Sequence, residues 1–61
     1  MFKLDQYLKF NGWVESGGEA KLKIRAGAVQ VNGMVETRRG RQLSPGDVIE
    51  LEGRRAVVGE E

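Results

Sequence analysis

Three arginines stand close together in the second half of this 61-residue chain, and their chemistry suits phosphate groups. Arg38, Arg39 and Arg41 each carry a planar guanidinium with several N–H donors, which matches the oxygens of a phosphate and stays charged near pH 7. Glu36 is the one acidic residue between positions 21 and 41. The cluster therefore reads as nearly free of acid, and it predicts a phosphate-binding surface.

A second basic feature precedes the cluster. Lys21 and Arg25 are separated by four positions, so on a helix they form one stripe. The formal charge is +5 over residues 21–41, −3 over residues 42–61 and −1 over residues 1–20, although the whole chain carries only +1. Ordinary mixed surface charge is the alternative, but this asymmetry favours a basic binding face backed by an acidic one.

The composition argues against catalysis and metal binding. The chain has no histidine and no cysteine, so the commonest general base, thiolate ligands and disulfides are all absent. The carboxylates show no metal-ligand spacing, and no nucleotide-binding glycine motif is present. We expect no catalytic residue, no metal and no cofactor. No apolar run is long enough to span a bilayer, and no secretory leader is evident, so we expect a protein of the reducing cytoplasm without a membrane partner.

Two short helices are predicted to come first. Apolar residues recur at helical spacing over residues 3–11, and Gly12 suits the position after the helix end. Ser16 and Glu19 have the spacing of a capping box, which predicts the start of a second helix that ends at Gly27. Trp13, between the helices, is assigned to the core rather than to stacking on a base, because so small a domain needs its largest side chain for burial.

The rest of the chain reads as strands and tight turns. Asn32-Gly33 lies between two strand-like runs and predicts a type I′ hairpin turn. Pro45-Gly46 predicts a type II turn, and residues 48–52 alternate between apolar and acidic. We expect a turn at Gly53-Arg54 and a last strand over residues 55–58. The tail, residues 59–61, is expected to fray.

These elements predict an α+β fold in which two short N-terminal helices pack on a small, mainly antiparallel sheet of three to four strands. Residues 1–61 are expected to form a single domain, with its core over residues 3–52. A chain of this length buries only about 60% of its unfolded surface, so the predicted core is thin.

Four stretches of the chain together resemble the S-four-type RNA-binding domain, also called the αL RNA-binding motif. They occur in the family's order and read KLDQYL (3–8), ESGGEAKLKI (15–24), GAVQVNG (27–33) and LSPGDVI (43–49). The combination of GGEAK with ETRRGR looks most like the small stand-alone bacterial members of that family.

The resemblance implies that RNA binds along the second helix and the adjacent hairpin. By position, Lys3 stands where the family has the arginine of R-L-D, Lys21 occupies a basic position of the second helix, and Asn32 lies in the turn of VNG. Many members have Ser-Arg where this chain has Gly17-Gly18. That departure removes a side-chain contact, which backbone amides or the arginine cluster would have to replace.

We therefore expect a non-catalytic, monomeric RNA-binding module for structured RNA, ribosomal or transfer. The residues expected to bind are Lys21, Arg25, Arg38, Arg39 and Arg41, with Lys3 and Asn32 at the margin. The alternative is a protein-interaction module whose basic hairpin docks on an acidic, ribosome-associated partner. A specificity module for a separately encoded enzyme is a third possibility.

Overall fold

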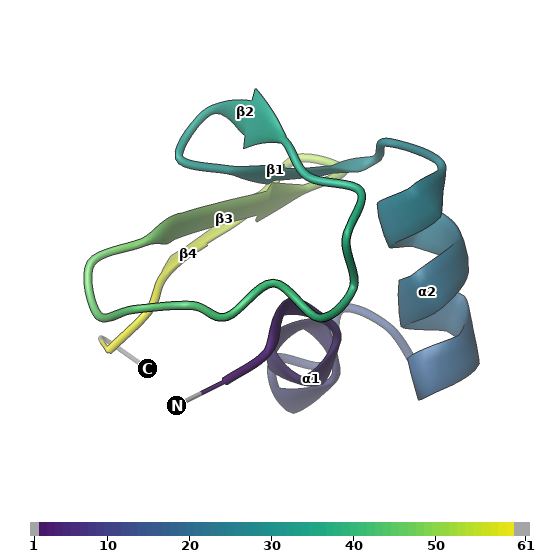
Figure 1. Ribbon diagram of the computed structural model, residues 1–61. Coiled ribbons are helices and arrows are strands. Elements are labelled where there is room, and N and C mark those ends of the chain that lie inside the picture. The colour runs from purple at the N-terminus through teal and green to yellow at the C-terminus, as the bar shows by residue number, and fades with distance from the viewer. Residues whose placement is uncertain (1, 60–61) are drawn as a thin grey trace.

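The computed structural model describes residues 2–59 and has an α+β fold, as predicted (Figure 1). Two helices come first and four strands follow, all of them paired antiparallel in one sheet. In chain order the elements are α1 (Leu4–Phe10), α2 (Gly17–Arg25), β1 (Val29–Val31), β2 (Met34–Val35), β3 (Val48–Leu51) and β4 (Arg54–Val57). The strands lie in the order β2-β1-β3-β4 across the sheet.

Both helices begin and end where local chemistry favours it. The Ser16 hydroxyl accepts a hydrogen bond from the Glu19 N–H at 3.1 Å and so caps α2. The Glu19 carboxylate accepts from the N–H of Glu15 at 2.7 Å, one residue earlier than a strict capping box requires. Gly12 and Gly27 have φ values of 72° and 81°, so each reverses the chain after its helix, as the sequence predicted.

The first hairpin is the predicted one. Asn32 and Gly33 have φ values of 54° and 82°, which a type I′ turn requires at both central positions. The turn sets Val31 opposite Met34, and β1 also pairs with β3 through Val31 and Ile49. Because β1 lies between β2 and β3 in the sheet, β2 is an edge strand, and the chain leaves the hairpin at this edge.

The second hairpin turns one residue earlier than expected. Glu52 and Gly53 are the central pair, with φ values of 51° and 83°, so the predicted turn at Gly53-Arg54 is wrong by one position. The last strand is accordingly Arg54–Val57 rather than residues 55–58. The sequence did not indicate a turn at Glu52, because glutamate seldom adopts a left-handed backbone conformation, whereas asparagine does so readily.

The core lies between the helices and one face of the sheet. Its buried apolar side chains are Leu4, Tyr7, Leu8, Val14, Ala20, Ile24, Val29, Val31, Leu43, Ile49, Leu51 and Val58. Trp13 packs against this cluster and is half-buried, which agrees with its assignment to the core. Leu22 points away from it and is 70% exposed. No helix within residues 2–59 is long and apolar enough to cross a membrane. In the predicted frayed tail, Glu60 and Glu61 lie outside the described residues.

Candidate functional site

The two flanks of α2 differ in charge pairing. Ala20 and Ile24 are fully buried and define the face of the helix that packs on the core. Lys23, on one flank, donates to the Glu52 carboxylate at 2.7 Å. Lys21 and Arg25 fall on the opposite flank, since successive helical residues are rotated by about 100°. Within residues 2–59 neither of them has an ion pair, so this flank presents two uncompensated cations.

The arginines lie on the segment 36–42, which follows the first hairpin and passes the start of α1 on its way to β3. Figure 1 shows this segment running from the end of β2 to the first turn of α1. There the Leu4 N–H donates to the Arg41 carbonyl at 2.8 Å, and the Asp5 N–H donates to the Arg39 carbonyl at 3.2 Å. The first N–H groups of a helix have no partner inside it, so the arginine segment supplies acceptors that α1 needs. Its backbone is therefore anchored.

Lys3 is brought beside this segment. It forms an isolated antiparallel bridge with Gln42, immediately before α1 begins. The structure thus places Lys3 with the arginine segment, as part of one group. Among residues 2–59, no hydrogen bond or ion pair joins that group to Lys21 or Arg25. The proposed site accordingly consists of two basic groups on one small domain.

The arginine cluster is not nearly free of acid, contrary to the sequence-based interpretation. Glu36 is 7% exposed, and its carboxylate lies between Arg38 and Arg41. Its Oε2 accepts from Arg38 Nε at 3.0 Å, and its Oε1 accepts from Arg41 Nη1 at 2.8 Å. These hydrogen bonds, that from Arg38 first, lower the pKa of Glu36 to about 2. Three guanidiniums and one carboxylate leave a net +2, not a bare +3.

Arg39 is the arginine of this segment without an ion pair within the described chain. Arg38 remains open to a ligand despite its pairing, because its side chain is 76% exposed, whereas that of Arg41 is 31% exposed. The acidic neighbour raises the pKa of Arg38 further above its ordinary value. The Arg38 guanidinium therefore stays charged at physiological pH.

Asn32 has a structural use for both ends of its amide. Its Oδ1 accepts from the Val48 N–H at 2.9 Å, and its Nδ2 donates to Asp47 at 3.1 Å. The side chain thus joins the first hairpin to the start of β3. Ser44 also donates its N–H to Asp47, and these two bonds lower the pKa of that carboxyl. Asn32 was predicted to contact RNA at the margin of the site, but its side-chain amide already forms hydrogen bonds that hold the turn.

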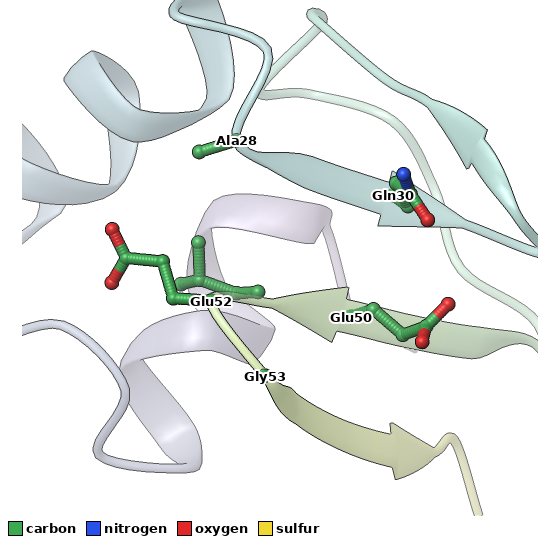
Figure 2. Close-up of a pocket in the computed structure, with 6 residues that line it drawn as sticks. Ala28, Gln30, Glu50, Glu52 and Gly53 are labelled. Atoms are coloured by element: carbon green, nitrogen blue, oxygen red, sulfur yellow. The ribbon is translucent and has the colours of Figure 1, made fainter.

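A hollow of about 180 Å³ lies on the Lys23 flank, and its lining is acidic (Figure 2). Gln30 and Glu50 face each other in register on β1 and β3, and Glu52 reaches from the β3–β4 turn towards α2. Carboxylates repel phosphate, so this hollow does not suit a polyanion. No group of acidic residues within 2–59 is arranged to hold a metal ion. The phosphate-compatible surface is therefore the opposite flank of α2 together with the arginine segment.

Sequence reasoning missed the role of Glu36. A signal existed, since Glu36 precedes Arg38 by two positions and Arg41 by five. Counting charges along the chain treated the glutamate as one unit to subtract, whereas its burial and its two arginine partners arise only in the folded segment.

The low pKa of Glu36 makes an acid-dependent loss of stability an expected result. A carboxyl whose pKa falls from 4.5 to about 2 on folding stabilises the fold fully above pH 4.5, and that contribution is lost as the pH falls through about 2. Asp47 acts in the same direction. Urea unfolding across this range should show the wild type losing stability more steeply than Glu36→Gln. An equal pH dependence of the free energy of unfolding in the two proteins would contradict a stabilising role for the ionised Glu36 carboxylate.

Comparisons with known proteins place this architecture in a recognised family. The model of a family described as "S4 domain" matches residues 1–59. A protein of Bacillus subtilis (strain 168) named "Probable ribosome maturation protein RlbA" is 45% identical over 53 residues, which cover 87% of this chain and 75% of the relative. A protein of Escherichia coli (strain K12) named "Putative RNA-binding protein YbcJ" is 39% identical over 56 residues, covering 92% and 80%.

A solved structure has the same fold within a longer chain. A solved structure described as "Crystal structure of pseudouridylate synthase" matches the whole of this chain, with a TM-score of 0.84 and 28% sequence identity. The match covers 26% of that protein, so this chain corresponds to about a quarter of it.

Proposed function

Since this chain belongs to the S4 domain family, we propose that it is a non-catalytic RNA-binding module that recognises structured RNA, ribosomal or transfer, through phosphate contacts. Lys21 and Arg25 on α2 form one contact group, and Arg38, Arg39 and Arg41 form the other. Lys3 extends the second group, and Asn32 supports the site by holding the first hairpin.

The observation that carries this proposal is the uncompensated flank of α2. Lys21 and Arg25 have no ion pair within the described chain, and no Asp or Glu occurs in the sequence between Glu19 and Glu36. A cationic stripe on a rigid helix attracts a polyanion and releases its counterions on binding. Lys23, two positions from Lys21 in sequence, is neutralised by Glu52 on the other flank, so the positive potential is directional.

The aromatic side chains favour recognition of RNA shape rather than stacking on successive bases. Phe2 packs against Tyr7 and Phe10, with ring centroids 5.4 and 4.9 Å apart, and Trp13 packs on the core. These are all four aromatic residues of the chain, and Phe10 is the one that is exposed, at 58%. A single exposed ring does not form a platform for successive bases. Single-strand readers use exposed aromatic platforms, whereas structured RNA is recognised largely through its backbone.

The relatives support a setting at the ribosome. One is named for ribosome maturation and another for RNA binding, so we propose that this chain acts on ribosomal RNA in the cytoplasm. The match covers 26% of the pseudouridylate synthase, so the likeness supports the fold and does not transfer that protein's activity to this chain.

Salt dependence of binding is the direct test. The arginine segment contributes a net +2 and the α2 flank another +2, so about four phosphates are neutralised when Lys3, at the margin of the site, is not counted. The logarithm of affinity for folded ribosomal or transfer RNA should then fall with the logarithm of salt concentration, with a slope of about −2.8 to −3.6. Filter binding or fluorescence anisotropy measures it. Affinity that does not respond to salt would refute the proposal.

The rival function is docking of the basic hairpin on an acidic, ribosome-associated protein. Crosslinking in cell lysate, with and without nuclease treatment, separates the two. Recovery of partners that disappears after nuclease treatment supports RNA binding, whereas recovery that persists supports the protein partner.

A further inference from the structure

Glu36 is the one charged residue that is buried within residues 2–59, and it lies inside the basic cluster rather than in the core. We propose that Glu36 is a positioning residue that holds Arg38 and Arg41 as a fixed pair of guanidiniums, and so favours structured RNA over flexible single strands. This inference rests on the proposed function and deepens it.

The hydrogen bonds show how one carboxylate orients both arginines. Arg38 presents its Nε and Nη2 to Glu36 at 3.0 and 3.3 Å, while Arg41 donates through Nη1 at 2.8 Å. An arginine side chain has five N–H donors, so Arg38 uses two and Arg41 uses one. The remaining donors stay available to phosphate oxygens, and the shared carboxylate sets the direction in which they point.

The backbone on either side of the Glu36 carboxylate is also held by hydrogen bonds. Its carboxylate also accepts the backbone N–H of Arg38 at 3.1 Å, and its own N–H donates to the Val29 carbonyl at 3.0 Å. On the far side, the Arg41 carbonyl accepts from the first turn of α1. The arginine pair is thus tied to β1 at one end and to α1 at the other, and neither side chain needs to be ordered when a ligand binds.

Fixed donors match phosphates whose spacing is also fixed. In folded RNA the backbone geometry is already set, so pre-ordered guanidiniums avoid the loss of side-chain entropy on binding. A flexible strand adapts to any arrangement of charges and gains little from such order. The carboxylate subtracts one unit of positive charge from the cluster, which lowers the attraction for every polyanion alike. Its net effect should therefore depend on RNA structure.

Two charge-matched variants distinguish positioning from simple electrostatics. Glu36→Gln and Glu52→Gln each remove one negative charge; the Glu36 carboxylate pairs with two arginines and the Glu52 carboxylate with one lysine. Charge alone predicts that both tighten RNA binding. We expect Glu36→Gln to weaken binding of folded RNA by about 5- to 100-fold, because two side chains lose their order, and to leave binding of oligouridylate unchanged or tighter. Glu52→Gln should weaken neither.

The folded probe is whichever of ribosomal and transfer RNA binds the wild type more tightly, and circular dichroism checks that each variant is folded. If Glu36→Gln binds folded RNA as tightly as Glu52→Gln does, the inference is overturned while a salt-dependent wild type keeps the proposed function intact. If the wild type binds no RNA, both are overturned.

A second variant guards against failure of Glu36→Gln to fold. Glu36→Asp keeps the charge, and aspartate readily accepts the N–H two residues ahead. Its side chain is one methylene shorter, so it cannot keep both guanidiniums in their present positions. We expect an unchanged salt slope and oligouridylate affinity, with weaker binding of folded RNA. Wild-type affinity for folded RNA would overturn the inference.

Discussion

Replacing both Lys21 and Arg25 by alanine is expected to weaken binding of structured RNA by about 10- to 100-fold. In the proposed complex each side chain would make a charge-assisted contact that contributes about 1 kcal/mol or more, and every 1.4 kcal/mol corresponds to a tenfold change in affinity. The salt slope should become shallower by about 1.4 to 1.8, since two fewer phosphates are neutralised. Anisotropy titrations at several salt concentrations measure both quantities.

Lys9→Ala/Arg55→Ala is the matched control for this pair. It removes the same charge from α1 and β4, and both residues are exposed and without an ion pair in the described part of the chain. The control should lose little affinity. Equal losses in the two double variants would show that only total charge matters, and that the flank of α2 is not a contact surface.

Ile24→Ala is expected to unfold much of the protein. Its side chain is fully buried, and truncating a buried isoleucine lowers the free energy of unfolding by about 2–5 kcal/mol. At roughly 0.05–0.15 kcal/mol per residue, a domain of this length has only about 3–9 kcal/mol in total. Thermal or urea unfolding followed by circular dichroism should show a large loss of stability and a substantial unfolded fraction at about 37 °C.

Leu22→Ala provides the control on the same helix. Leu22 is 70% exposed, so its truncation should change the free energy of unfolding by less than about 0.5 kcal/mol. Alanine is at least as good a helix former as leucine, and α2 itself is not weakened. A large effect of Leu22→Ala would mean that this apolar side chain is covered in solution.

Local chemistry made most of the fold predictable. Asn32-Gly33 and the Ser16 cap act within a few residues, so their sequence signals survive without knowledge of the tertiary structure. The Glu52-Gly53 turn escaped prediction because the register of β3 and β4 holds a glutamate in a conformation that it seldom adopts alone.

The candidate site was less predictable because its organisation is tertiary. The spacing of Lys21 and Arg25 predicted one flank correctly, since a helix relates residues at fixed intervals. The environment of Arg38 could not be predicted from sequence spacing. It depends on Glu36 being buried beside β1, where its N–H donates to the Val29 carbonyl, and on the Arg39 and Arg41 carbonyls accepting from the first turn of α1.

The two ends of the described chain offer a practical route to studying this surface. The Phe2 carbonyl accepts from the Leu43 N–H, and the Val58 carbonyl accepts from the Gly46 N–H, so both ends are held by the stretch between β2 and β3. Figure 1 shows them on the opposite side of the molecule from α2. A fluorophore, affinity handle or surface tether attached beyond the C-terminal end would therefore leave Lys21 and Arg25 unobstructed for single-molecule recordings of binding. An attachment beyond the N-terminal end would instead adjoin Lys3 of the second basic group.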